Sequence, residues 1–169
     1  MERQPNVVFM LADNLGVGDL SCFGGAVPTP RIDRLAAEGM RLTNFNTEAQ
    51  CTPTRGALLT GRMPIRTGTF RVPLPGEPGD YGLCNWEYTV ADLFSDAGYA
   101  TACYGKWHLG NVDGRFPNEQ GFDERWGITE SSDTASYSAH RLFTDEWPVP
   151  TIHEARRGEP QESEVDFEH

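Results

Sequence analysis

The sequence has few positive charges and almost no lysine. Its 169 residues include 25 acidic and 14 basic ones, a net charge of −11, and Lys106 is the single lysine. A chain this acidic is poorly suited to the phosphate backbone of nucleic acid or to an anionic membrane surface, so we expect neither as a partner. A lone lysine among arginines indicates a position that needs a compact ammonium group, although one lysine could fall anywhere by chance.

Cysteine is also scarce, and long hydrophobic runs are absent. Cys22, Cys51, Cys84 and Cys103 are widely separated, which excludes a disulfide-built scaffold and the usual zinc-site spacings. The first apolar run, Val7 to Ala12, is too short for a membrane span, and no signal peptide is visible. As written, the chain is expected in the cytoplasm, or in the periplasm or outside the cell if a leader has been removed.

The apolar patterns predict alternating strands and helices. In chain order we expect a strand at 6–12, a helix at 30–38, a strand at 40–46, a helix within 53–61, a helix at 90–97 and a strand at 99–104. Met63 to Trp86 is rich in proline and glycine and predicts a long loop. This order indicates an α/β fold in layers, with polar residues collected at one rim of the sheet.

The chain divides by composition near residue 145. Residues 1–145 carry the predicted elements and read as one domain. The stretch from Asp145 to His169 holds eight acidic and two basic residues, with prolines but little apolar pattern. We therefore expect residues 146–169 to form an acidic, weakly structured tail.

The most informative segment is residues 51–62, Cys-Thr-Pro-Thr-Arg-Gly-Ala-Leu-Leu-Thr-Gly-Arg. Pro53 suits the first turn of a helix and Gly61 suits its end, which places Cys51 just ahead of the helix amino terminus. Free backbone N–H groups and the helix dipole favour an anion there. Arg55, one turn into the helix, adds a fixed cationic fork. The arrangement would hold a reactive group against a tetrahedral oxyanion.

These twelve residues resemble the sulfatase signature, Cys-x-Pro-Ser/Thr-Arg-x-x-Leu-x-Thr/Ser-Gly-Arg. The eight matching positions are Cys51, Pro53, Thr54, Arg55, Leu58, Thr60, Gly61 and Arg62. The resemblance implies that a maturation enzyme oxidises Cys51 to formylglycine, whose hydrated aldehyde is the nucleophile. The alternative for Cys51 is a buried apolar thiol.

A second block, Gly-Lys-Trp-His-Leu-Gly at 105–110, also resembles sulfatases. Residues two apart on an extended segment point to the same side, so Lys106 and His108 could reach one ligand. By resemblance, Lys106 contacts the sulfate oxygens, and His108 holds the sulfate or the formylglycine hydroxyl. The alternatives are a solvated lysine and a structural histidine.

Asp13 and Asn14 follow the first predicted strand and offer hard oxygen ligands. Sulfatases usually have two aspartates here, so the asparagine removes one formal charge and weakens the attraction for a cation. The resemblance implies a divalent metal, calcium or alternatively magnesium, held by Asp13, Asn14 and the modified Cys51. Without that resemblance, Asp-Asn before a leucine and a glycine is a common turn.

The resemblance covers about residues 5 to 125, the amino-terminal part of a sulfatase. It implies an alkaline-phosphatase-like layered sheet with flanking helices and hydrolysis of a small sulfate ester. Longer relatives add a second half with further metal and sulfate ligands, so this chain is expected to be truncated, inactive or dependent on a carboxyl-terminal partner. Two alternatives are a phosphonate or phosphodiester hydrolase of the same superfamily, and a non-enzymatic fragment that binds a metal or a partner chain.

Overall fold

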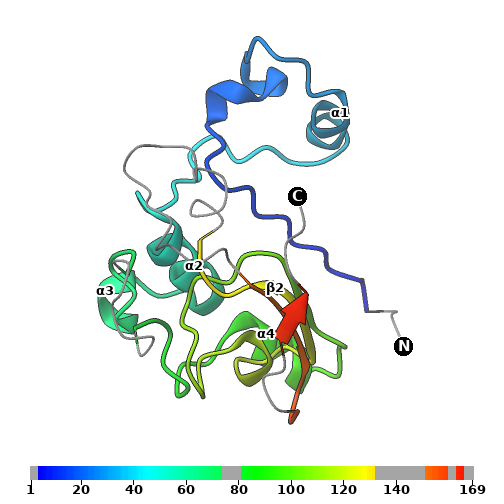
Figure 1. Ribbon diagram of the computed structural model, residues 1–169. Coiled ribbons are helices and arrows are strands. Elements are labelled where there is room, and N and C mark those ends of the chain that lie inside the picture. Colours follow the sequence, from blue (N-terminus) through cyan, green and yellow to red (C-terminus); the bar gives the residue numbers. More distant parts are fainter. Residues whose placement is uncertain (1–3, 74–80, 132–150, 160–162, 166–169) are drawn as a thin grey trace. The chain divides into compact units, whose positions relative to one another are not determined.

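The computed structural model describes residues 4–73, 81–131, 151–159 and 163–165. The chain divides into two compact units, Met1–Asn46 and Thr47–His169. Figure 1 colours the first unit blue to cyan and the described parts of the second unit from cyan through green to red.

In the first unit the predicted helix is confirmed as α1, Pro30–Glu38, preceded by the short 3-10 turns η1, Val17–Asp19, and η2, Ser21–Phe23. Pro30 is its first residue, and the Gly39 N–H closes it on the Leu35 carbonyl at 3.0 Å. Ser21 Oγ and Thr29 Oγ1 both donate to the Asp33 carboxylate, over 2.6 and 2.9 Å. These bonds tie η2 to the start of α1.

The two strands predicted in the first unit are not formed, because residues 6–12 and 40–46 have no regular secondary structure. The side chains of Val8, Phe9 and Met10 are 82, 66 and 77% exposed. A continuous apolar run becomes a central strand only where neighbouring strands bind its backbone on both sides. The described residues of this unit supply no such strands.

The second unit holds helices α2, Cys51–Thr60, α3, Pro64–Thr67, and α4, Val90–Asp96, and the 3-10 turn η3, Pro117–Glu119. Helix α2 contacts both α3 and α4. Helix α3 falls inside the stretch predicted as a loop. Helix α4 begins at the predicted cap: Thr89 Oγ1 accepts from the Asp92 N–H at 3.1 Å, and the Asp92 carboxylate accepts from the Thr89 N–H at 2.8 Å.

A mixed sheet forms the other layer of the second unit (Figure 1). Its order within the described residues is β1-β2-β3-β4, with bounds Ala102–Tyr104, Glu124–Ile128, Ile152–Arg156 and Ser163–Val165. β1 and β2 are parallel, with Tyr104 opposite Trp126, whereas the other pairs are antiparallel. β1 confirms the end of the strand predicted at 99–104. Because β1 and β2 are parallel, their carboxyl ends meet at one edge of the sheet.

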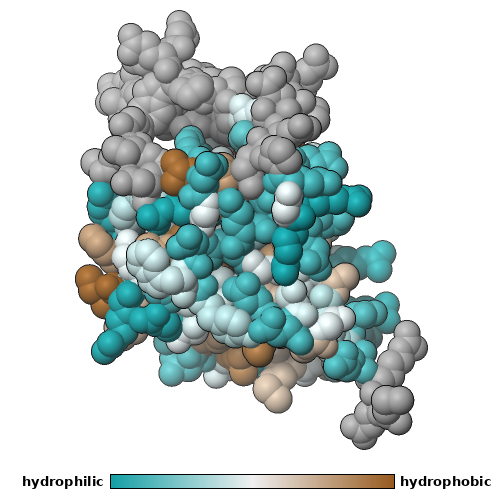
Figure 2. Space-filling view, turned by 90° about the horizontal axis from the view of Figure 1, so that it is seen from below, coloured by the Kyte–Doolittle hydropathy of each residue, from teal (hydrophilic) through white to brown (hydrophobic). Residues whose placement is uncertain are grey.

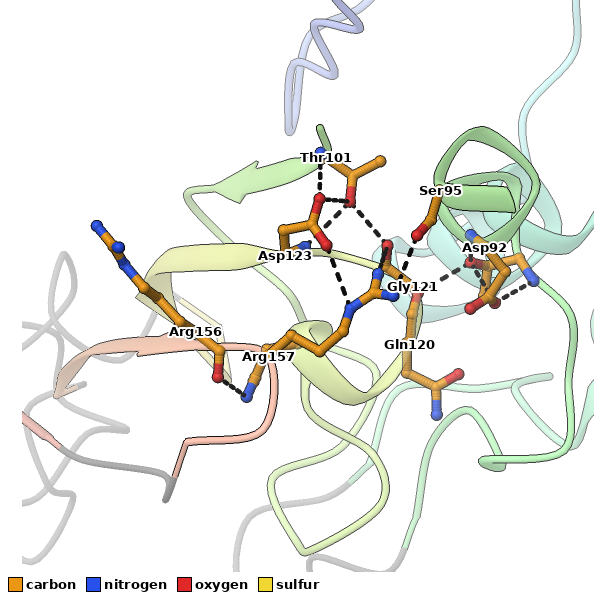
Figure 3. A network of polar contacts seen from close by, with 10 residues as sticks. Asp92, Ser95, Thr101, Gln120, Gly121, Asp123, Arg156 and Arg157 are labelled. Atoms are coloured by element: carbon orange, nitrogen blue, oxygen red, sulfur yellow. Dashed lines mark hydrogen bonds and ion pairs between the residues drawn. The ribbon is translucent and has the colours of Figure 1, made fainter. Parts of the chain in front are cut away.

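The expectation of a weakly structured tail is wrong over 152–156 and 163–165, which form β3 and β4. The physical reason is that β3 pairs with β2 and with β4, and Figure 3 shows Arg157, the residue after β3, pointing toward Asp123, Gly121 and Ser95. Its Nε lies 3.3 Å from Asp123 Oδ1, Nη1 donates to Ser95 Oγ at 3.0 Å, and Nη2 donates to the Gly121 carbonyl. One of the two arginines in the acidic stretch therefore also anchors it to the residues just before β2 and to α4. The proposed division at residue 145 remains a prediction.

The core cluster of the second unit is small and includes two residues of the second sequence block, Trp107 and Leu109. Leu83, Trp107 and Leu109 are 0, 3 and 0% exposed, and Trp107 meets the Phe122 ring edge-on with centroids 6.2 Å apart. Many large apolar side chains of the described residues are exposed to solvent. Figure 2 shows brown hydrophobic patches among teal hydrophilic surface on the face seen from below. Among the described residues, no helix has the length and hydrophobicity needed to cross a membrane.

Candidate active site

Helix α2 carries the sulfatase-like signature. Gln50 occupies the N-cap position, so Cys51 is the first residue of the helix rather than the residue before it. Gly61 ends the helix at φ +64°, as its position in the signature predicts, and its N–H donates to the Ala57 carbonyl at 2.8 Å. Cys51 is half-buried and lies in the turn where backbone N–H groups favour an anion.

Two hydrogen bonds join α2 to the segment that follows β1. Thr52 Oγ1 donates to the His108 carbonyl at 3.0 Å, and Arg55 Nη1 donates to the Lys106 carbonyl at 2.5 Å. The partners are more than 50 residues apart in sequence. The fold therefore brings the helix of Cys51 and Arg55 together with the segment of Lys106 and His108, within one unit.

The segment after β1 is fixed to the end of β2 and the residue that follows it. Trp107 N–H donates to the Ile128 carbonyl at 2.9 Å, and His108 N–H donates to the Thr129 carbonyl at 3.0 Å. His108 is only 5% exposed and has φ +57°, in the left-handed region that costs a residue with a side chain about 1–3 kcal/mol. The segment is thus not plainly extended at His108. Simple alternation, the basis of the prediction that Lys106 and His108 face one side, does not apply here.

Ser131 is a neighbour of Lys106 that the sequence analysis missed. Lys106 Nζ donates to Ser131 Oγ at 3.2 Å, and Ser131 lies three residues beyond the end of β2. Nothing in the sequence around Ser131 marks it. Its position follows only from the parallel pairing of β1 and β2, which places the residues after both strands at one edge.

The four cysteines are free thiols, and their surroundings differ. Burial raises the pKa of the Cys103 thiol to about 11, although Arg55 and Arg125 act in the opposite direction. Cys103 packs against the core formed by Leu83, Trp107 and Leu109. Cys103 is therefore an inert core thiol, which is the alternative role given above for Cys51.

Asp13 and Asn14 lie in the first unit and are exposed. Asn14 has φ +56°, a left-handed conformation that asparagine tolerates well, so the pair forms a turn with two oxygen-bearing side chains. This donor chemistry fits a hard divalent cation. Within 4–73, 81–131 and the described tail, no three His, Cys, Asp or Glu side chains cluster as a metal site. Asp13 and Asn14 would thus supply only part of a coordination shell. An ion shared with Cys51 of the second unit stays a prediction.

Comparison with known proteins identifies the family. The model of the Sulfatase family matches residues 5–155. Human arylsulfatase A is 47% identical over 136 residues, which cover 78% of this chain and 26% of the human protein. An arylsulfatase of Hemicentrotus pulcherrimus is 47% identical over 158 residues, covering 85% of this chain and 26% of that protein. The chain belongs to the sulfatase family, as its two sequence blocks predicted.

Solved structures agree with this assignment. The crystal structure of PsFucS1 sulfatase from Pseudoalteromonas sp. superposes with a TM-score of 0.81 at 35% identity, covering 95% of this chain and 36% of that one. A further structure, in complex with its substrate D-glucosamine-2-N,6-O-disulfate, has a TM-score of 0.64 at 28% identity, covering 90% of this chain and 26% of that one. The alkaline-phosphatase-like fold is thereby confirmed as a partial domain. The chain spans about a quarter of the length of the curated relatives described above.

Proposed function

We propose that this chain supplies the nucleophile-bearing part of a sulfatase that hydrolyses sulfate esters. The observation that carries the proposal is the pair of hydrogen bonds from Thr52 and Arg55 to the carbonyls of His108 and Lys106. They support a single site built from the two sulfatase-like blocks. The family suggests a formylglycine and a divalent metal in general terms. Conversion of Cys51 by a maturation enzyme, and calcium or magnesium as the ion, belong to the proposal.

The roles of the residues follow from their charge and surroundings. A hydrated formylglycine at position 51, when present, supplies the attacking oxygen. Lys106 would place its ammonium against the sulfate oxygens, with the free N–H groups of the first turn of α2 adding to the positive field. Ser131 would orient that ammonium. Arg55 both holds the Lys106 main chain and adds positive charge. His108 would hold the hydroxyl of residue 51 or a sulfate oxygen by a hydrogen bond.

The metal would be held in part by the Asp13 carboxylate and the Asn14 amide oxygen. A bound divalent cation supplies positive charge that stabilises the sulfate oxygens as the ester bond breaks. Because no three His, Cys, Asp or Glu side chains cluster as a metal site among the described residues, the remaining ligands would come from water, substrate or further polypeptide.

The test is an assay of the purified chain with its modification state known. Intact-mass and peptide analysis first establish whether position 51 is cysteine or formylglycine. The protein is then assayed with an aryl sulfate, a sugar sulfate, a phosphonate ester and a phosphodiester. Faster hydrolysis of a sulfate ester than of the phosphonate ester and the phosphodiester supports the proposal, provided that the activity is lost in Cys51→Ala and kept in the control Cys84→Ala. Preference for the phosphonate or phosphodiester would instead favour the related hydrolase class.

A second candidate, a fragment that acts only with a partner polypeptide, is favoured by the exposed apolar side chains of Val8, Phe9 and Met10. A run of exposed large apolar side chains of this kind usually marks an interaction site. A partner corresponding to the remaining three quarters of a longer relative would cover it. The same assay separates the two candidates: an inactive chain with confirmed formylglycine that gains sulfatase activity when co-expressed with such a polypeptide acts as the partner-dependent form.

A further inference from the structure

We propose that Thr52 is a positioning residue of this site. Its hydroxyl binds the His108 carbonyl and so fixes the histidine to the first turn of α2, beside Cys51. Position 52 is unspecified in the sulfatase signature, so the resemblance gives Thr52 no role. The inference rests on the proposed function, because it assigns Thr52 to the alignment of two residues that the proposed reaction uses.

The hydrogen bond of Thr52 is well protected from water. The Thr52 side chain is 0% exposed, and its Oγ1 lies 3.0 Å from the His108 carbonyl oxygen. A buried hydrogen bond that is removed cannot readily be replaced by one to water, so its loss is felt by both partners. Thr52 also sits next to Cys51 on a regular helix, which leaves little freedom between the nucleophile position and this hydroxyl.

The backbone of His108 gives this bond its significance. With φ +57°, His108 has a conformation that persists only where the surrounding structure enforces it. The Thr129 carbonyl holds the peptide group on one side through the His108 N–H, at 3.0 Å. Thr52 holds the peptide group on the other side through the His108 carbonyl. If the second bond is lost, one of the two identified restraints on the left-handed conformation disappears.

A purely space-filling role for Thr52 makes the opposite prediction for two simple variants. Thr52→Val keeps the shape of the side chain and removes the donor, whereas Thr52→Ser keeps the donor and removes a methyl group. A positioning hydroxyl tolerates serine and not valine. A space-filling side chain tolerates valine and not serine.

The matched control is Thr67→Val. Thr67 is 3% exposed, and its hydroxyl donates to the Pro64 carbonyl at 3.2 Å and pairs with Thr69 Oγ1 at 2.8 Å. The substitution removes one buried hydroxyl, as Thr52→Val does, but from α3, where the hydroxyl binds Pro64 and Thr69. It therefore reports the general cost of such a loss.

The experiment uses the full 169-residue chain and NMR. The backbone carbon shifts of His108 report its φ angle, and amide exchange reports how firmly it is held, with the α4 amides as reference. We expect Thr52→Val to move the His108 shifts away from left-handed values and to speed exchange of its amide at least about tenfold over the α4 amides. Thr52→Ser and Thr67→Val should leave both within about twofold of wild type. Unchanged His108 signals in Thr52→Val, or an equal change in Thr67→Val, would overturn the proposal.

Activity is measured separately, so that the two proposals can fail independently. If wild-type chain hydrolyses a sulfate ester, Thr52→Val should lower kcat by about tenfold to a hundredfold with KM nearly unchanged, because the bound substrate meets a displaced histidine. An unchanged kcat with a released His108 would overturn the catalytic meaning of the bond. If wild type is inactive with formylglycine present, the proposed function fails for the isolated chain, and the NMR result still decides whether Thr52 positions His108.

Discussion

Arg62 donates a hydrogen bond from Nη1 to Glu87 Oε2 across 2.5 Å, which joins the last residue of the signature to the turn before α4. The Glu87 side chain is 5% exposed, whereas that of Arg62 is 48% exposed. The two ends of the signature thus have different roles. Its first residues face the proposed chemistry, and its last residue satisfies a buried carboxylate.

Arg62→Gln should destabilise the second unit. The substitution leaves the Glu87 carboxylate buried without its cation, and because Arg62 is half exposed we expect a loss of about 1–3 kcal/mol in the free energy of unfolding. Chemical denaturation measures it. Arg34→Gln is the control. Both side chains of the Arg34–Glu38 pair on α1 are exposed, so we expect its loss to lower the free energy of unfolding by about 0.5 kcal/mol or less. Equal losses in the two variants would contradict a structural role for the buried pair.

Gly56→Ala should also destabilise the protein, for steric reasons. A Cβ at position 56 would lie 2.3 Å from Thr69 Oγ1 and 3.0 Å from Thr69 Cβ, and Thr69 is fully buried. We expect overpacking to cost about 1–3 kcal/mol, measured by thermal or chemical unfolding. In Gly18→Ala the new methyl group meets nothing within 4 Å, so its stability should be close to wild type. Partial recovery in the double variant Gly56→Ala, Thr69→Ala would identify the clash as the cause.

The local features of the site could be predicted from the sequence because their causes are local. The Thr89 cap of α4 and the left-handed Gly61 at the end of α2 each depend on side chains and backbone within a few residues. The two sequence blocks were recognisable for a related reason, since residue type and spacing carry the resemblance. That Thr52 and Arg55 would bind the main chain of the second block was not predictable from either block alone.

The features that sequence reasoning missed depend on distant contacts. Ser131 approaches Lys106 only because β1 and β2 pair in parallel. Strand β3 forms in an acidic stretch because it pairs with β2, and Arg157 after it binds Asp123 and Ser95, which are far away in sequence. The run at 6–12 has a central-strand pattern, but a strand also requires partners that the described residues of its unit lack.

Cys103 makes the stability of the second unit sensitive to alkaline pH. Burial raises its pKa from 9.0 to about 11, so between these values the unfolded chain gives up a proton that the folded chain keeps. The contribution to stability is complete below about pH 9 and is lost as the pH rises towards about 11, a decline of roughly 1–3 kcal/mol. Urea unfolding at several pH values measures the slope. Cys103→Ala has no thiol to ionise at this position, so its free energy of unfolding should change less with pH over the same range. Identical slopes in the two proteins would assign the effect to other groups.

Asn14→Asp should strengthen binding of a divalent cation to this chain. The substitution adds one negative charge beside Asp13, and a second unit charge about 4 Å from a cation contributes about 1 kcal/mol in water and more when partly shielded. We expect calcium affinity to rise at least about fivefold, measured by isothermal titration calorimetry at constant ionic strength. The turn should survive, because aspartate also tolerates the left-handed conformation seen at φ +56°.

The control for the added charge is Asn6→Asp, which gives the protein the same net charge eight positions upstream. At physiological ionic strength a charge beyond about 8 Å is largely screened, so this variant should bind calcium as wild type does. Asp13→Ala should weaken binding below wild type, since it removes the one formal charge of the pair. If Asn14→Asp and Asn6→Asp bind calcium equally well, the Asp13–Asn14 pair is a structural turn and not a cation site. If only Asn14→Asp gains affinity, the cation binds at the Asp13–Asn14 pair, and the single carboxylate of the pair limits how tightly it binds there.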